Sequence, residues 1–134
     1  MPFILTRLTL PSLIQILAIM SSERGQRIEA NCKIIWGDGD YDLDIETDDW
    51  VDWQCSVKRD YGDAFGPPLT MNGLCNSQDR AWSELNRMLD VWARQVQSGL
   101  PMTKEQSLDI FSGPNGQSRA VLGKFLDELK RREG

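Results

Sequence analysis

An alternation of apolar and polar residues runs through residues 27–59, and it constrains the fold more than any other feature of the sequence. Successive side chains of a β-strand point to opposite faces, so strict alternation predicts a strand with one buried and one solvent-facing side. The pattern stays in phase through the segments 27–36, 40–46 and 50–57. We therefore expect a three-stranded antiparallel meander. Its apolar face would carry Ile28, Ala30, Cys32, Ile34, Trp36, Tyr41, Leu43, Ile45, Val51, Trp53, Cys55 and Val57.

The two turns of this meander determine which residues pair, because a slip of one residue would move every apolar side chain to the wrong face. Asp38-Gly39 is a favoured two-residue hairpin turn, and it keeps the apolar residues of the first two segments on one face. For the second hairpin, a three-residue loop at 47–49 does the same and pairs Ile45 with Val51. A two-residue loop would place an acid opposite an apolar residue.

Residues 77–97 change to a helical spacing, with apolar side chains three and four residues apart. Ser77 is a suitable N-cap and Gly99 a suitable stop signal. We expect this helix to cover the apolar face of the sheet. Its core stripe would carry Ala81, Trp82, Leu85, Met88, Leu89, Trp92 and Val96.

Two further helices are expected near the C-terminus. Thr103 and Gln106 form a capping-box pattern at the start of a short helix that ends near Phe111. The last helix covers about 118–132, and it too has an apolar stripe that we expect to pack into the core. That stripe consists of Val121, Leu122, Phe125, Leu126 and Leu129.

The N-terminal residues 1–22 are apolar and form either a helix starting at Pro11 or a cleaved leader. The apolar run is shorter than the ~20 residues that a membrane-spanning helix needs, so we expect no membrane span. Residues 23–134 form one α+β domain of two layers. An antiparallel sheet of three strands packs against two or more helices, with the N-terminal helix before it, and a segment at 69–71 would add a fourth, edge strand.

The charge of the chain is unevenly distributed. Residues 38–63 hold ten Asp and Glu against two Lys and Arg, whereas the other residues carry ten acids and thirteen bases. This argues against a phosphate backbone as the ligand, so nucleic acid is not the expected partner. The three cysteines have no metal-binding spacing and favour a reducing compartment, so we expect a cytoplasmic or nuclear protein, or a secreted one if the leader is cleaved.

The chain has no histidine, which excludes Ser-His-Asp and Cys-His catalysis and His-ligated metal sites. Cys75 precedes the helix start at Ser77, where the helix dipole would lower the pKa of a thiol, but no histidine can pair with it. No motif indicates a cofactor. An enzyme is therefore the less favoured class of function.

The predicted candidate site is the polar face of the sheet. Asp40, Asp42 and Asp44 line one strand, and the predicted register places Asp44 opposite Asp52, with Trp50 beside them. Like charges in that arrangement repel one another, and a cationic partner would relieve the repulsion. We therefore expect a non-enzymatic interaction or regulatory module that binds a protein with a basic surface, with Trp50 supplying a cation–π contact.

Two alternatives rest on the same residues. The pair Asp44/Asp52 would serve a divalent-metal site or a carboxylate-based hydrolytic enzyme, and the latter needs a cleft. An EF-hand is disfavoured because Leu43 stands where the calcium loop needs glycine, and Asp49 replaces its final glutamate.

The order of helix, antiparallel strands and helix is similar to that of the double-stranded RNA-binding domain, which implies an RNA partner. The long helix of that family opens with a cluster of lysines. The corresponding residues here, Ser77-Gln78-Asp79-Arg80, contain one base and one acid. We therefore assign no family from the sequence, and the charge disfavours this third alternative.

Overall fold

The computed structural model describes residues 6–7 and 22–133. The predicted helix or leader within residues 1–22 lies largely outside this range, as does its start at Pro11. Within the described residues the elements are β1 (Thr6–Arg7), α2 (Glu23–Trp36), β2 (Asp40–Thr47), β3 (Gln54–Asp60), β4 (Phe65–Met71), α3 (Gln78–Gln97), α4 (Lys104–Phe111), a short 3-10 turn η1 (Pro114–Gly116) and α5 (Arg119–Glu133). The expected α+β fold, with a helix before an antiparallel meander, is confirmed.

The segment 27–36, predicted as a strand, is the helix α2. Ser22 caps it by accepting a hydrogen bond from the Gly25 amide at 3.1 Å. Ile28 and Cys32 are fully buried, and their separation of four residues satisfies a helical period as well as a period of two. The prediction was wrong because the spacing of these two residues fits a helix as well as a strand. Ala30 and Ile34, which only the strand would bury, are exposed.

The meander is instead formed by β2, β3 and β4, and within the described residues β1 pairs with the outer side of β2. Ile45 pairs with Cys55 rather than with Val51, so the predicted register of this hairpin was wrong. The error equals four residues, an even number, and therefore leaves the apolar side chains of β2 and β3 on the correct face. Val51, also predicted on that face, lies between the two strands and is exposed. The predicted turn at Asp38-Gly39 is the link between α2 and β2.

The link from α2 to β2 is held by one arginine. Arg59 of β3 donates hydrogen bonds to the carbonyl oxygens of Trp36 at 2.6 Å and Asp38 at 2.9 Å. Its guanidinium also lies 4.9 Å from the centre of the Tyr41 ring. Gly37 ends the helix with a φ of 98°, a conformation that L side chains rarely adopt. These contacts stabilise the change of chain direction between α2 and β2.

The loop expected near 60–74 contains β4, a longer strand than the predicted segment 69–71. Pro67 and Pro68 lie within it, and the pairing with β3 has irregularities. Proline has no amide hydrogen to donate, so it is tolerated at the edge of a sheet. β4 is accordingly an edge strand.

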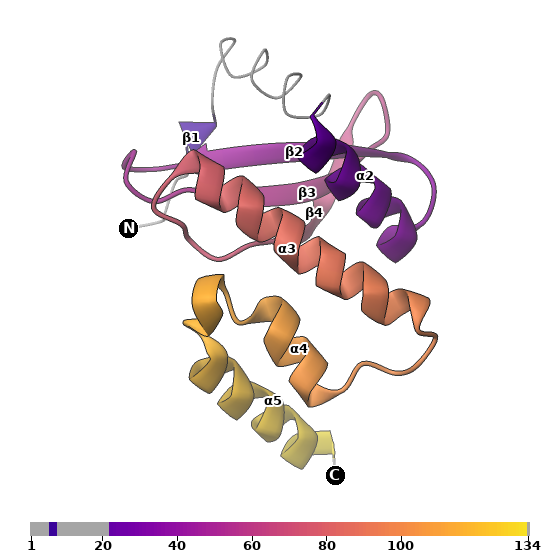
Figure 1. Cartoon of the computed structure of the whole chain (residues 1–134), viewed down its shortest axis with the longest axis vertical. Coiled ribbons are helices and arrows are strands. Elements are labelled where there is room, and N and C mark those ends of the chain that lie inside the picture. Colours follow the sequence, from indigo (N-terminus) through magenta and orange to yellow (C-terminus); the bar gives the residue numbers. More distant parts are fainter. Residues whose placement is uncertain (1–5, 8–21, 134) are drawn as a thin grey trace.

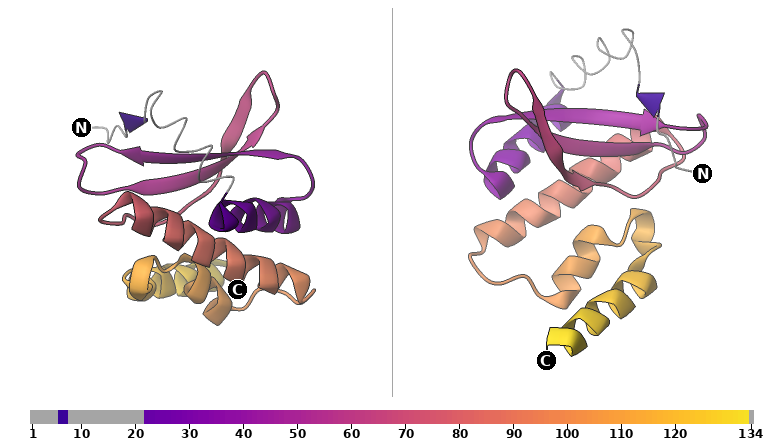
Figure 2. Two further views of the ribbon diagram at one scale, coloured as in Figure 1. Left: turned by 45° about the horizontal axis from the view of Figure 1, so that its top comes forward. Right: turned by 180° about the vertical axis from the view of Figure 1, so that it is seen from behind.

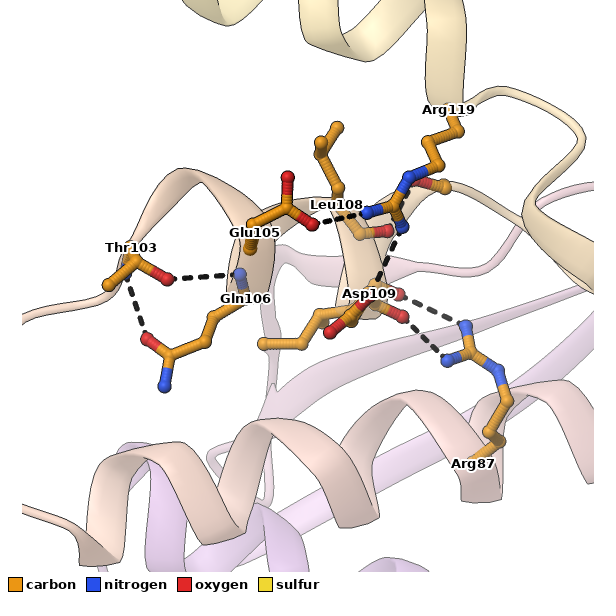
Figure 3. Close-up of polar contacts among 9 residues, drawn as sticks. Arg87, Thr103, Glu105, Gln106, Leu108, Asp109 and Arg119 are labelled. Carbon is orange, nitrogen blue, oxygen red and sulfur yellow. Dashed lines mark hydrogen bonds and ion pairs between the residues drawn. The ribbon is translucent and has the colours of Figure 1, made fainter.

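The predicted positions and caps of α3 and α4 are confirmed, whereas Val96, predicted in the core stripe of α3, is 38 % exposed. Ser77 caps α3 by accepting from the Arg80 amide at 3.1 Å. At α4 the Thr103 hydroxyl accepts from the Gln106 amide, and the Gln106 side chain accepts from the Thr103 amide (Figure 3). These signals are local in sequence, which explains why they were recognised.

The core lies between the sheet and the helices α2 and α3, while α4 and α5 lie on the side of α3 away from the sheet (Figures 1 and 2). The buried core residues are Ile28, Cys32, Tyr41, Leu43, Ile45, Trp53, Cys55, Val57, Cys75, Ala81, Trp82, Leu85, Met88, Leu89 and Ile110. No residue of α5 is buried, so its predicted contribution to the core was wrong. α5 packs on α4 instead.

Candidate interaction site

The acids predicted on the sheet face are in different environments. Asp40 is exposed and Asp42 is half-buried, whereas Asp44 is only 2 % exposed. Ser56, not Asp52, lies opposite Asp44. The predicted like-charged pair of Asp44 and Asp52 was therefore wrong. The divalent-metal site and the hydrolytic enzyme both depended on that carboxylate pair, so the structure does not provide the site that these alternatives require.

Trp50 and Asp52 lie instead in the connection between β2 and β3. We call residues 48–52 the acidic loop. Asp48, Asp49, Trp50 and Val51 are exposed and Asp52 is half-buried. The loop therefore combines three carboxylates with two apolar side chains at one end of the sheet.

The acidic loop is held in place by hydrogen bonds between its backbone and the side chains of Thr47 and Asp49. The Thr47 hydroxyl donates to the Asp52 carbonyl at 2.7 Å and accepts from the Trp50 amide at 2.9 Å. The Asp49 carboxylate accepts from the amides of Val51 and Asp52, both at 2.9 Å. Thr47 is fully buried, so it anchors the loop to the body of the protein.

Trp50 has a φ of 62°, in the left-handed region that bulky residues avoid. Such a conformation costs about 1–2 kcal/mol and persists only where the surroundings determine it. Here the bond from the Trp50 amide to Thr47 does so. The ring packs edge-on against buried Trp53, with centroids 5.6 Å apart and planes at 76°, yet Trp50 stays 64 % exposed. Val51 is similarly exposed, at 62 %.

The carboxylates of the loop influence one another. Reduced hydration, followed by the charges of Asp49 and Asp52, raises the pKa of Asp48. Hydrogen bonds from the amides of Asp52 and Val51 lower the pKa of Asp49. The carboxylates of the loop are therefore close enough to interact with one another, and a cation bound among them would be stabilised.

A cleft of about 530 Å³ lies beside the acidic loop and is lined by Asp52 but not by Asp44. Two of its other charged groups, Glu84 and Arg87, hold the fold together, while Arg80 is exposed. Glu84 is buried and ion-paired with Arg87. Arg87 also donates to the carbonyls of Asp109 at 2.7 Å and Ile110 at 3.2 Å, which fastens α4 to α3 (Figure 3).

Cys75 lines the same cleft, and its thiol is not activated. Burial, followed by the charge of Glu84, raises the pKa of Cys75. The expected lowering by the helix dipole was therefore wrong. All three cysteines are buried and free. Among residues 6–7 and 22–133, no three His, Cys, Asp or Glu side chains are grouped so that they could hold a metal ion.

The remaining tryptophans have structural positions, as expected. Trp53 and Trp82 are buried. Trp36 and Trp92 are half-buried and contact each other edge-on at 5.1 Å. The alternation in the sequence correctly predicted that Trp50 is exposed, but it placed Trp50 in a strand, opposite Glu46. The hydrogen bonds of Thr47 and Asp49 that hold the loop leave no trace in the periodicity of the sequence, so periodicity could not predict them.

Comparison with models of known families, with curated proteins and with solved structures finds no match. Within the described part of the chain, no helix combines the length and apolar character needed to cross a bilayer.

Proposed function

We propose that this protein is a non-enzymatic interaction module that binds a basic segment of a partner protein through its acidic loop. The observation that carries the proposal is the exposed Trp50, which a strained backbone presents between three carboxylates. Backbone strain of this kind concentrates at functional positions. Large aromatic side chains that stay exposed on an ordered support are characteristic of binding hot spots.

The chemistry of the loop specifies the partner. The face of the Trp50 indole attracts a lysine or arginine cation. Asp48 and Asp52 can accept charge-assisted hydrogen bonds from the same or a neighbouring cation. Val51 adds an apolar contact, so a suitable segment has bases interspersed with apolar residues. The fixed loop requires little ordering on binding, which favours affinity.

The proposed site retains Trp50 and Asp52 from the sequence-based prediction and adds Asp48, Asp49 and Val51. Asp40 and Asp42 belong to the part of β2 far from this loop, and Asp44 is buried. They are not part of the proposed contact surface.

The proposal is tested by titrating the chain with synthetic peptides in which arginine or lysine alternates with leucine, and following tryptophan fluorescence and heat. The variant Trp50→Gly should weaken binding at least about tenfold, equivalent to ~1.4 kcal/mol. Glycine suits the positive φ, so this variant should fold normally. Binding by the natural chain should weaken as salt rises from ~0.05 to ~0.5 M.

The matched control for charge is Asp63→Asn, which removes one exposed acid outside the loop, against Asp52→Asn within it. Only the latter should weaken binding. If no basic peptide binds, or if Trp50→Gly and Asp52→Asn bind as well as the natural chain, the acidic loop is not a docking site.

A further inference from the structure

The cleft of about 530 Å³ beside the acidic loop has the size of a binding site. Ligand pockets typically have volumes of about 300–1,000 Å³. We call this cleft the polar cleft, because most of the side chains that line it are charged or carry amide or hydroxyl groups. They come from the acidic loop, from the connection 74–76, from the first half of α3 and from the turn at 114–117.

The floor of the polar cleft is one row of α3. Arg80, Glu84 and Arg87 follow one another at spacings of four and three residues, so they lie on the same side of the helix. Glu84 is buried and pairs with Arg87, and Arg87 also donates to backbone carbonyls of α4 (Figure 3). This part of the cleft is therefore ordered before any ligand binds, which lowers the cost of binding.

The two walls of the polar cleft contact each other at Gly73. A Cβ at this position would lie 3.1 Å from Cδ of Pro114 and 3.4 Å from Cα of Gly113, so glycine allows this close approach. Asn76 and Asn115, one from each wall, are exposed and line the cleft. A side-chain amide both donates and accepts hydrogen bonds, as a peptide backbone requires of its partner.

Arg80 and Asp52 are the two charged groups of the polar cleft that are not used by the fold. Arg80 is exposed and Asp52 is half-buried. Within residues 6–7 and 22–133, neither side chain has an oppositely charged group within 4.0 Å, so the two do not pair with each other. A ligand that satisfies both groups must carry a base for Asp52 and an acid for Arg80.

The polar cleft is continuous with the acidic loop, because Asp52 belongs to both. Trp50 packs on Trp53 with ring centroids 5.6 Å apart. The Trp53 amide donates to the carbonyl of Cys75 at 2.7 Å, and the Cys75 amide donates to the carbonyl of Trp53 at 2.9 Å. Cys75 in turn lines the cleft. A segment bound on Trp50 is therefore close to the mouth of the cleft.

We propose that the polar cleft binds the continuation of the same partner segment, and that this segment carries a carboxylate that pairs with Arg80. The inference rests on the proposed function and specifies its partner as a segment with a basic part and an adjoining acid. Asn76 and Asn115 would hydrogen-bond the backbone between the two charges. A carboxylate suits the cleft better than a phosphate group, because Asp52 and Glu84 would repel a second negative charge.

The experiment is titration of the full chain with pairs of basic peptides that are blocked at both ends. One member of each pair carries a glutamate beyond the basic part, and the other carries a glutamine at the same place. A spacer of about one to five glycines, each spanning ~3.3 Å, separates it from the basic part on either side. A basic peptide with a free C-terminus and no glutamate tests a chain end as the source of the carboxylate.

At one spacer length the glutamate peptide should bind about fivefold more tightly than its glutamine partner, equivalent to ~1 kcal/mol. Arg80→Gln should abolish this gain. It should leave the binding of the glutamine peptide unchanged or make it tighter, because it removes a base near Asp52. Arg80 is exposed, so the variant should fold normally.

The matched control is Arg27→Gln, which removes an exposed arginine of α2 outside the polar cleft. It should keep the full gain from glutamate. Trp50→Gly should weaken the binding of both peptides, because it acts on the acidic loop. A gain from the free C-terminus that is lost in Arg80→Gln supports the inference and identifies a chain end as the source.

The inference and the proposed function fail in different ways. If basic peptides bind but no carboxylate improves binding, or if the gain persists in Arg80→Gln, the inference is wrong and the acidic loop remains a docking site. If no peptide binds, both are wrong. A phosphoserine peptide that binds more tightly than the glutamate peptide, and loses this advantage in Arg80→Gln, would overturn the choice of a carboxylate.

Discussion

α3 and α5 are both amphipathic helices, and they differ in what their apolar sides meet. α3 lies between the sheet and α4 and also packs along α2, and its inner side is buried (Figure 2). Its buried residues are Ala81, Trp82, Glu84, Leu85, Met88, Leu89 and Ala93. α5 lies at the outside of the molecule, packs on α4, and buries none of its residues.

The difference shows that amphipathicity determines which side of a helix is apolar, but not which surface that side meets. The apolar side of α3 is covered by elements that come before and after it in the chain. The apolar side of α5 is wider than the surface that α4 offers, so part of it stays in water.

The largest expected effect is a difference between α3 and α5 in how much a substitution lowers the free energy of unfolding. Leu85→Ala removes a fully buried side chain of α3 and should lower the free energy of unfolding by about 3 kcal/mol, because it leaves a cavity. Phe125→Ala removes a side chain that is 56 % exposed and should change it by no more than ~0.5 kcal/mol. Urea denaturation followed by far-UV circular dichroism measures both. Equal losses would mean that α5 belongs to the core after all.

A smaller effect concerns alkaline pH and the layer formed by α2 and α3. Burial, and to a lesser extent the charge of Glu29, raise the pKa of Cys32 from 9.0 to about 12. The unfolded chain therefore loses this proton first, so the stability contributed by the protonated thiol is complete below pH 9 and is lost between pH 9 and pH 12. At pH 10 this thiol alone should account for a loss on the order of 1 kcal/mol.

The measurement compares urea midpoints at pH 8 and pH 10. Cys32→Ala starts from a lower stability but should lose less of it on going to pH 10. Burial also raises the pKa of Cys55, so part of the alkaline loss should remain in this variant. An equal pH effect in the natural chain and in Cys32→Ala would show that the thiol is not responsible.

The smallest effect concerns acid pH and the contact between α4 and α5. The hydrogen bond from Lys104 lowers the pKa of Asp127 below 3.8. The ionised carboxylate therefore stabilises the contact fully above that value, and the contribution disappears as pH falls through the lowered pKa. The protection of the α5 amides, measured relative to their intrinsic exchange rates, should decrease below about pH 4 before that of the α3 amides does. Asp127→Asn should show faster exchange in α5 with no such pH step.

The features that depended on neighbours in sequence were predicted well. The caps at Ser77 and Thr103 and the spacing of α3 were sufficient to place two helices. The alternation of β2 was also predicted correctly, as was the matching of its faces with those of β3. The face to which a strand residue points depends only on its position along the strand. The exposure of Trp50 followed from the same alternation.

The features that depended on competition between local patterns were predicted incorrectly. Ile28 and Cys32 fit a strand and a helix equally, and the cap at Ser22 together with packing against α3 decided for the helix. The pairing of β2 with β3 moved by four residues because Thr47 and Asp49 bind the backbone of the acidic loop and hold it out of the sheet. As a result Asp44 and Asp52, expected to face each other, lie apart.

The sequence alone determined the class of fold, the apolar side of most elements and the concentration of acids between residues 38 and 63, since all three follow from the order of residue types. The tertiary structure decided which acids are exposed and which apolar side is left uncovered. Burial is a property of the surface opposite a side chain, and that surface comes from parts of the chain far away in sequence. The negative charge is therefore concentrated in an ordered, exposed loop around Trp50, and the last helix leaves Val121 and Phe125 exposed to solvent.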